Sequence, residues 1–231
     1  MNWITAHITR SPISARVAPF ATFVILTFCQ GYLGETGRYW VYLAKTLLGA
    51  WMLWLVRPFV QEMRWRISWE ALLVGVAVFV LWVGLDDWLI RLGFANSYPK
   101  PKLSGAAWNP GAHFGEGAAP AWFFIIVRIA GSTLVVPALE EVFFRSFLYR
   151  YVMKVDFLAV PLGVFAWTPF VVVSLLFGFE HREWLAGILC GFAYQGLVCW
   201  KKRIGDAMTA HAITNLLLGI WVVWRGAWQF W

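Results

Sequence analysis

Charged residues are scarce in this chain of 231 residues. Asp, Glu, Lys and Arg together make up 13% of it, whereas a soluble domain carries about 25%. Hydrophobic residues account for 61%. The chain is long enough for one large soluble domain, but this composition argues against that class and indicates a protein whose solvent is lipid.

Cysteine is rare too, and several common catalytic motifs are missing. Cys29, Cys190 and Cys199 all fall in apolar runs without a C-x-x-C pair, so neither a disulfide framework nor a cysteine metal site is indicated. We expect all three in the core. The chain also lacks G-x-S-x-G and H-E-x-x-H, so the serine-hydrolase and common zinc-protease classes gain no support.

What the chain does have is a series of long apolar runs. A helix needs about 20 apolar residues to cross a bilayer. The segment 138–154 is too charged to assign from hydropathy, and it is either the second half of a long kinked helix or a separate span. The predicted fold is all-α, a polytopic transmembrane helix bundle with seven or eight spans. The candidate spans lie at about 18–33, 40–56, 70–90, 121–137, 157–179, 184–200 and 207–224.

The longest polar stretch divides the chain into two parts. Residues 91–120 are rich in Gly, Pro and Ala and are expected to form a loop. Residues 1–120 then hold N-terminal transmembrane helices and this loop, and 121–231 form a helical core, the two making one integrated domain. The first apolar run resembles a signal peptide, but no cleavage site is evident, so we expect a transmembrane helix.

The basic residues predict an orientation in the membrane. The net charge of +7 is best explained by the positive-inside rule rather than by nucleic-acid binding. The basic residues fall into four clusters that can all lie on the cytoplasmic side of the membrane. The clusters contain Arg10 and Arg16; Arg57, Arg64 and Arg66; Arg150 and Lys154; and Lys201, Lys202 and Arg203.

Ionisable residues inside apolar runs are candidates for function, because a charge in lipid is costly. Glu141 and Arg145 are four residues apart with the acid first, which suits a pair on one helix face. Glu140 is rotated by about 100° from Glu141, so one carboxylate is paired while the other stays reactive. Pro137 removes a backbone donor just before them. A salt bridge at a membrane interface is the alternative explanation.

Two further groups carry histidines. His181 follows an apolar helix, with Phe177 one turn earlier, and it could also be an interfacial histidine. His211 and Asn215 are four residues apart and share a helix face, where they line a polar site or form hydrogen bonds between helices. Together the three groups can hydrolyse an amide, because a carboxylate and a histidine activate water and amide and imidazole N–H groups stabilise an oxyanion.

At these residues the chain resembles the CAAX protease and bacteriocin-processing (CPBP, Abi) family of intramembrane glutamic endopeptidases. That family carries E-E-x-x-x-R, F-x-x-x-H and H-x-x-x-N in this order. The resemblance covers about 133–219. The matching residues are Glu140, Glu141, Arg145, Phe177, His181, His211 and Asn215.

The resemblance implies roles for these residues. Glu140 would be the general base, and His181 would help to position or activate the water. His211 and Asn215 would bind the oxyanion, and Glu141 with Arg145 would hold the helix geometry. No cofactor is expected, although two histidines and a glutamate could ligate zinc, so a zinc-dependent peptidase is the rival.

The chain departs from the family pattern in two places, and the predicted spans pose a problem of depth. Ser146 stands where the family often has Gly, and Glu180 precedes His181. Simple alternation of spans puts His181 and His211 near opposite membrane faces. A shared site requires either that Pro161 and Pro169 break the helix before His181 or that 138–154 is a separate span.

The function expected from these residues is that of an intramembrane endopeptidase acting on a membrane-associated or lipid-modified protein or peptide. Its partners would be membrane lipid and that substrate, without nucleic acid. It would be a multi-pass protein of the prokaryotic inner membrane. A non-catalytic membrane scaffold or sorting partner on the same fold is the alternative.

Two other cations, Arg128 and Lys45, also lie within apolar runs. Arg128 is expected to pair with a carboxylate, and Lys45 is expected to reach an interface.

Overall fold

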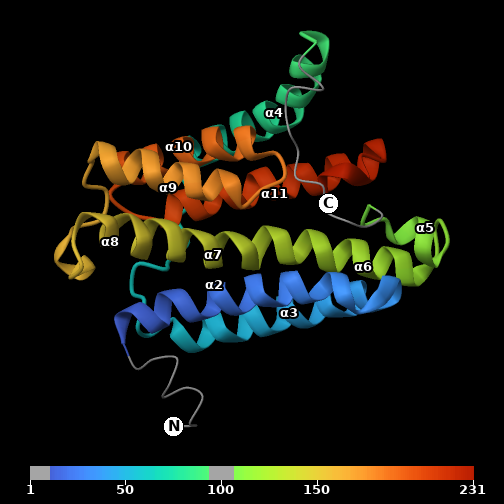
Figure 1. The fold of residues 1–231 in the computed structure, drawn as a ribbon, viewed down its shortest axis with the longest axis horizontal. Helices are drawn as coiled ribbons and strands as arrows, with labels where there is room; N and C mark the ends of the chain where they lie inside the picture. The colour runs from blue at the N-terminus through green and yellow to red at the C-terminus, as the bar shows by residue number, and fades with distance from the viewer. Residues whose placement is uncertain (1–10, 94–106) are drawn as a thin grey trace. The chain divides into compact units, whose positions relative to one another are not determined.

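The structure, a computed structural model, describes residues 11–93 and 107–231. Within these residues every regular element is a helix, which confirms the all-α prediction. Arg10 and residues 94–106 of the predicted loop lie outside the described residues. The α-helices (Figure 1) are α2 (Pro12–Cys29), α3 (Gly34–Val56), α4 (Trp69–Arg91), α5 (Pro110–Phe114), α6 (Ala119–Ala130), α7 (Val136–Glu141), α8 (Tyr149–Met153), α9 (Trp167–Phe179), α10 (Trp184–Lys201) and α11 (Gly205–Arg225).

Helices lie at all seven predicted spans, and several meet the requirements of a membrane crossing. Four stretches are long and apolar enough on length and composition, so the chain is an all-α membrane helix bundle. The apolar parts of α4 and α9 are shorter, and the total of seven or eight spans stays a prediction. The four stretches are Pro12–Tyr32, Gly34–Val56, Ala119–Met153 and Gly205–Arg225.

Residues Ala119–Met153 form one helical run of 35 residues. The segment 138–154 is therefore the second half of a long helix and not a separate span. Two π-helical segments interrupt the α-helical hydrogen bonding of this run, at Gly131–Val135 and Val142–Leu148. Such π segments are rare and occur frequently at functional sites.

The helix predicted over 157–179 is too long. Only a single 3-10 turn, Phe157–Ala159, forms in its first half, and α9 begins at Trp167. The helix is therefore broken before His181, which is one of the two arrangements that a site shared by His181 and His211 requires. With 13 residues, α9 rises by about 20 Å, which is less than the ~30 Å of a bilayer core. His181 therefore need not lie at a membrane face.

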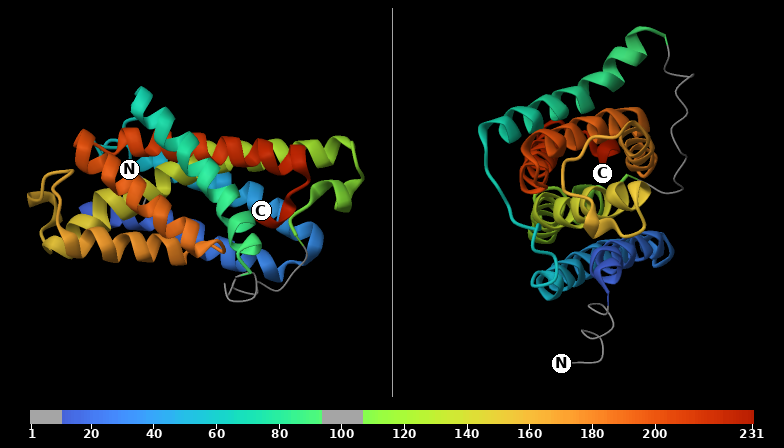
Figure 2. Two further views of the ribbon diagram at one scale, coloured as in Figure 1. Left: turned by 90° about the horizontal axis from the view of Figure 1, so that it is seen from above. Right: turned by 90° about the vertical axis from the view of Figure 1, so that its left-hand side faces the viewer.

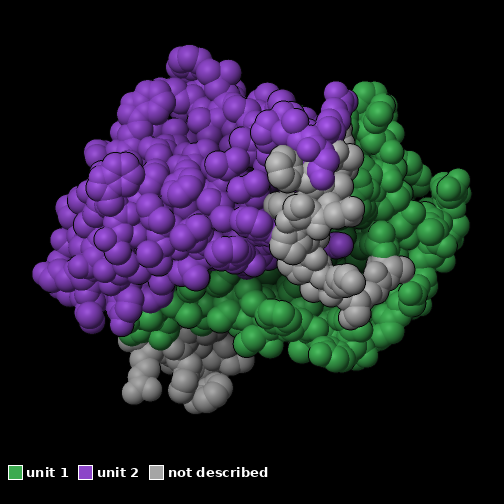
Figure 3. All heavy atoms as spheres, turned by 45° about the horizontal axis from the view of Figure 1, so that its top comes forward, with its two compact units in different colours: residues 1–63, 105–143, 215–231 green, residues 64–104, 144–214 purple. Residues whose placement is uncertain are grey.

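Contacts between residues divide the chain into two compact units (Figure 3). Unit 1 comprises Met1–Met63, Gly105–Phe143 and Asn215–Trp231, and unit 2 comprises Arg64–Ser104 and Phe144–Thr214. The chain passes from one unit to the other inside the long helical run and again inside α11. The predicted division at residue 120 stays a prediction.

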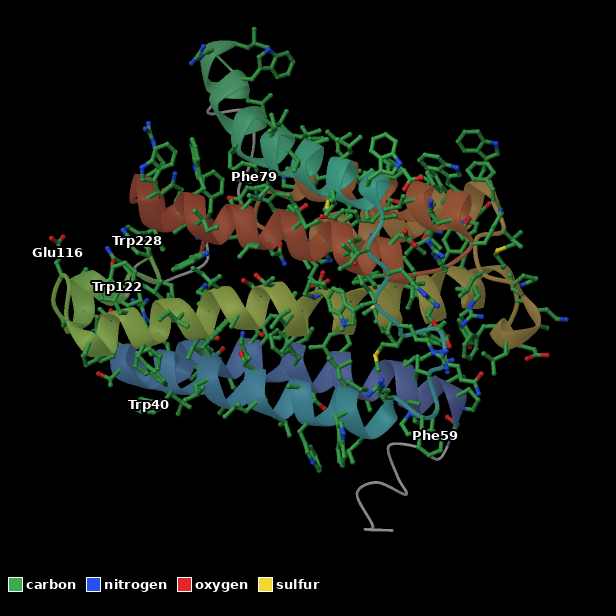
Figure 4. All side chains as sticks on the ribbon, turned by 180° about the vertical axis from the view of Figure 1, so that it is seen from behind. Trp40, Phe59, Phe79, Glu116, Trp122 and Trp228 are labelled. Atoms are coloured by element: carbon green, nitrogen blue, oxygen red, sulfur yellow. The ribbon has the colours of Figure 1, made fainter. Side chains whose placement is uncertain are left out.

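Unit 1 contains α2 and α3, which lie side by side (Figures 1 and 2). An ion pair of 2.7 Å between Arg16 and Glu62 joins α2 to the chain beyond α3. Large aromatic side chains of this unit point outward, as Trp40, Phe59 and Trp122 show (Figure 4), with 56%, 48% and 49% of their surface exposed. Such side chains suit contact with lipid.

Two buried cations of unit 1, Lys45 and Arg128, have contacts other than those predicted. Lys45 lies in the middle of α3, only 4% exposed, and donates to the Thr27 hydroxyl at 2.8 Å, so it does not reach an interface. The Arg128 guanidinium lies over the rings of Trp108 and Tyr42, 4.6 and 5.0 Å from their centroids. Within the described chain no carboxylate forms an ion pair with Arg128, and cation–π contacts replace the expected partner.

In unit 2, α9 and α10 form a closely packed hairpin. A Cβ built at Gly187 would lie 2.9 Å from the Cα of Gly178, and one built at Gly191 would lie 2.9 Å from the Cα of Ser174. The Gly187–Gly191 pair therefore packs helices within the chain, as small residues four apart commonly do in membranes.

We predict that Gly178→Ala destabilises this hairpin by about 1–3 kcal/mol, the usual cost of overpacking. The new Cβ would lie 2.6 Å from the Ile188 backbone nitrogen and 2.8 Å from the Trp184 carbonyl oxygen, neither of which can rotate away. Thermal unfolding in detergent measures the effect. Gly196→Ala on α10 is the matched control, because its Cβ meets nothing within 4 Å and gains up to about 1 kcal/mol of helix propensity. Equal midpoints for the two variants would contradict the prediction.

Candidate functional site

The two predicted glutamates lie on α7, a segment of 6 residues between the two π-helical segments. Glu140 is 8% exposed and Glu141 is fully buried, both in unit 1. Each is therefore largely removed from solvent, where a carboxylate requires compensation. The predicted pairing of Glu141 with Arg145 remains a prediction, as these residues belong to different units.

Asn215 also belongs to unit 1, near the middle of α11. Its side-chain Nδ2 donates a hydrogen bond of 2.8 Å to the carbonyl oxygen of Ser132, in the first π-helical segment. One turn further along α11, a Cβ built at Gly219 would lie 3.0 Å from Ile129. This half of α11 therefore packs closely against the long helical run, and the side chain of Asn215 is held by it.

In unit 2 the ring of Phe177 is a meeting point for three predicted site residues. The Arg145 guanidinium lies 4.3 Å from the Phe177 centroid. The rings of His181 and His211 lie 4.9 and 5.9 Å from it. Phe177 is fully buried, and Arg145 is 1% exposed. Three polar groups from three separate stretches of sequence are thus gathered around one phenylalanine.

The hydrogen bond of His181 defines its tautomer. Its Nδ1 lies 2.8 Å from the carbonyl oxygen of Phe177. A carbonyl can only accept, so Nδ1–H donates, and in the neutral ring Nε2 keeps a lone pair. The ring of Trp82 on α4 packs edge-on against His181, with centroids 5.3 Å apart. His181 therefore presents an oriented acceptor.

His181 lies just beyond the end of α9, and its surroundings keep it neutral. Burial lowers the pKa of His181 to about 4, and the neighbouring Arg145 acts in the same direction. The bond to the Phe177 carbonyl opposes this shift. At neutral pH the imidazole is therefore unprotonated, and its free ring nitrogen can accept a hydrogen bond.

His211 is held by contacts that the sequence did not predict. Its ring stacks on Tyr194 of α10 at a centroid distance of 5.1 Å and an angle of 26°. The Tyr194 hydroxyl donates to Thr214 at 2.7 Å, and the Thr214 hydroxyl donates to the Gly75 carbonyl of α4 at 2.9 Å. These bonds connect α10, α11 and α4 next to the histidine.

The structure thus gathers some predicted residues and leaves others apart. Arg145, His181 and His211 meet in unit 2, whereas Glu140, Glu141 and Asn215 belong to unit 1. Sequence reasoning missed the supporting residues. Thr214 stood inside the H-x-x-x-N motif and could have been noticed as a helix hydroxyl next to it, but nothing in the sequence marked Trp82, Ser132 or Tyr194.

Ser146, which departs from the family pattern, forms a hydrogen bond with Arg150. Its hydroxyl accepts from Arg150 Nη2 at 3.0 Å, and it is fully buried. A glycine there could not supply this acceptor. As for metal ligands, no group of three or more His, Cys, Asp or Glu residues suited to a metal ion occurs among the side chains that the structure describes. The expectation that no metal is used stays a prediction.

One comparison with known proteins gave a match. Residues 120–217 match a family model described as Rce1-like, "Type II CAAX prenyl endopeptidase Rce1-like". No curated protein and no solved structure matches the chain significantly. All six predicted site residues lie within the matched segment, from Glu140 to Asn215.

We predict that His181 makes the folded state sensitive to acid. Because its folded-state pKa of about 4 lies below the ordinary ~6.5, the unfolded chain binds the proton first. The stabilisation is complete above about pH 6.5 and is lost as the pH falls towards 4. Thermal unfolding of His181→Gln in detergent at pH 7.5 and 4.5 should show a smaller acid loss than wild type, by about 1–3 kcal/mol. Identical acid losses would show that His181 does not carry the effect.

Proposed function

We propose that the chain is an intramembrane endopeptidase of the Rce1-like type II CAAX prenyl endopeptidase family, whose model matches residues 120–217. The proposed reaction is hydrolysis of a peptide bond in a membrane-associated or lipid-modified protein or peptide. The family is one of peptidases, and the apolar helices make this an integral membrane protein. The mechanism and the residues that perform it are the proposal.

The observation that carries the proposal is the meeting of His181 and His211 on Phe177, beside Arg145. A buried histidine, a half-buried histidine and a buried arginine are costly in an apolar bundle. A bundle that only needed stability would be served better by apolar side chains at these positions. Their gathering within the family-matched segment favours catalysis over a scaffold.

In the proposed reaction Glu140 removes one proton from a water molecule, while Nε2 of His181 accepts a hydrogen bond from the other O–H and so orients the water. The water oxygen attacks the peptide carbonyl carbon, and negative charge develops on the carbonyl oxygen. N–H groups of His211 and Asn215 stabilise this oxyanion. Glu140 then gives the proton to the leaving nitrogen as the C–N bond breaks, which yields a carboxylic acid and an amine. The proton of the acid then passes to the amine, so the products leave as a carboxylate and an ammonium group.

The neutral state and fixed tautomer of His181 support its proposed role. A carbonyl bound at Nδ1 leaves Nε2 as the acceptor, which is the geometry that a water-orienting base requires. Asn215 uses one Nδ2–H for Ser132, and an amide has a second N–H for an oxyanion. Arg145 and Glu141 hold the helix in this scheme and do not touch the substrate.

The substrate would arrive through the lipid, which suits a hydrophobic or lipid-modified chain. We place the protein in the inner membrane of a prokaryotic cell and assign it no nucleic-acid partner and no cofactor. A zinc-dependent reaction on the same residues and a non-catalytic scaffold are outcomes that the experiments below distinguish.

We predict that Glu140→Gln abolishes cleavage while the protein stays folded. Glutamine is nearly isosteric, but it cannot take up a proton, so kcat should fall by about 10³-fold or more. The assay uses purified protein in detergent and a library of quenched-fluorescent C-terminal peptides with and without a lipid group. Circular dichroism and the thermal midpoint report folding.

A chelator arm separates the competing explanations. Wild-type cleavage that survives chelation supports the metal-free reaction, and cleavage that is lost with chelator and restored by zinc supports the zinc enzyme. Full activity of Glu140→Gln would overturn the proposed base. A folded wild type that cleaves no peptide in the library would count for the scaffold.

We also predict that Asn215→Asp lowers kcat by about 10²–10³-fold with little change in KM. A carboxylate has the shape of the amide but cannot donate a hydrogen bond to the oxyanion. The expected decrease in kcat is the one measured in other enzymes when an oxyanion-hole donor is removed. Steady-state kinetics with the best peptide test this. An increase in KM at constant kcat would instead assign Asn215 to substrate binding.

A further inference from the structure

We propose that Pro137 is a positioning residue for Asn215, because it leaves the carbonyl oxygen of Ser132 free to accept the Asn215 amide. The catalytic role of Asn215 rests on the proposed function, but its positioning by Pro137 does not. The inference concerns three residues of unit 1: Ser132, Pro137 and Asn215.

The argument starts from the hydrogen-bond register of the first π-helical segment. In a π helix the N–H of residue i+5 donates to the carbonyl of residue i. The Val136 N–H follows this register and donates to the Gly131 carbonyl. The next donor in the same register would be residue 137, for the carbonyl of Ser132. Residue 137 is proline and has no N–H, so the register ends there.

The Ser132 carbonyl therefore has neither of its usual helical donors. Its α-helical donor, the N–H of Val136, is engaged with Gly131, and its π-helical donor does not exist. A buried carbonyl without a donor is unfavourable, because it has lost its hydrogen bond to water and gained none in return. The side chain of Asn215 supplies the donor instead, with Nδ2 2.8 Å from the Ser132 oxygen.

The geometry of α11 makes this bond possible. Gly219, one turn beyond Asn215, allows α11 to approach Ile129 closely, since a Cβ there would lie 3.0 Å from the side chain of Ile129. Asn215 and Gly219 on α11 thus face Ser132 and Ile129 on the long run. An anchored amide has its plane fixed by one bond, and its second N–H then points in a defined direction.

The energetics suggest a role beyond stability. Proline inside a helix is less favourable than alanine, because it removes a backbone N–H. An alanine at 137 would restore this donor. The proline thus removes a helical hydrogen bond and supplies an acceptor for the Asn215 amide.

The test is Pro137→Ala in the full-length protein in detergent. The restored N–H competes with the Asn215 amide for the Ser132 carbonyl. We expect the thermal midpoint to stay equal or rise. We expect kcat to fall by about 10–100-fold at nearly constant KM, as a small displacement of a catalytic group does. A merely structural proline would change stability and activity together.

A second measurement reports the amide directly and needs no activity. The chain has four asparagines, so selective labelling with ¹⁵N-asparagine gives few side-chain amide signals, and Asn215→Asp identifies that of Asn215. In Pro137→Ala this signal should shift and its hydrogens should exchange faster with solvent. The matched control is Pro19→Ala, which replaces the proline inside α2 and should leave both kcat and the Asn215 signal unchanged.

The outcomes separate this inference from the proposed function. A moved Asn215 signal with reduced kcat supports both. If the wild type cleaves and Pro137→Ala leaves kcat and the Asn215 signal unchanged, the positioning role is wrong. If the wild type does not cleave any peptide, the proposed function fails, and the Asn215 signal alone decides: a shift supports the positioning by Pro137, and no shift overturns it.

Discussion

Lipid offers no hydrogen-bonding partner, and this constraint favours buried polar groups that the chain itself satisfies. Two of the described groups show how the chain does so. Thr214 accepts from Tyr194 and donates to the Gly75 carbonyl. The Ser132 carbonyl, which lacks a backbone donor next to Pro137, accepts from Asn215. Side chains with catalytic potential thus also serve the helices that hold them.

Cations in this protein are held by aromatic rings as much as by acids. Arg128 lies over Trp108, Lys45 over Phe23 and Arg145 over Phe177. A ring face attracts a cation without adding a second charge to the apolar interior. Phe177 has an additional consequence, because the ring that holds Arg145 also packs against both histidines. Phe177, which the sequence presents only as the apolar residue of F-x-x-x-H, is therefore a central contact in unit 2.

The long helical run shows how local irregularity creates a special environment. Glu140 and Glu141 occupy a short α-helical segment with a π-helical segment on either side. Each π segment changes the hydrogen-bond register, so the carbonyls next to it become available to side chains. In an unbroken α-helix the backbone would use these groups, and Asn215 would have no acceptor at Ser132.

The sequence by itself determined the helical class and most helix positions, and it marked the polar residues of the candidate site. Apolar length and scarce charge require helices in lipid, and the spacing of Glu140, Glu141 and Arg145 needs no structure to be noticed. Prediction from the sequence failed where a contact depends on distant parts of the chain. The partner of Arg128 proved to be aromatic, because packing brought rings rather than a carboxylate to it.

Only the tertiary structure decided the rest. The break before α9 was one of two alternatives that the sequence left open. Tyr194 stacks on His211, about 20 positions away in the sequence. Asn215 donates a hydrogen bond to the carbonyl of Ser132, about 80 positions away. Spacing along one helix predicts which side chains share a face, but it carries no information about which other helix will face them.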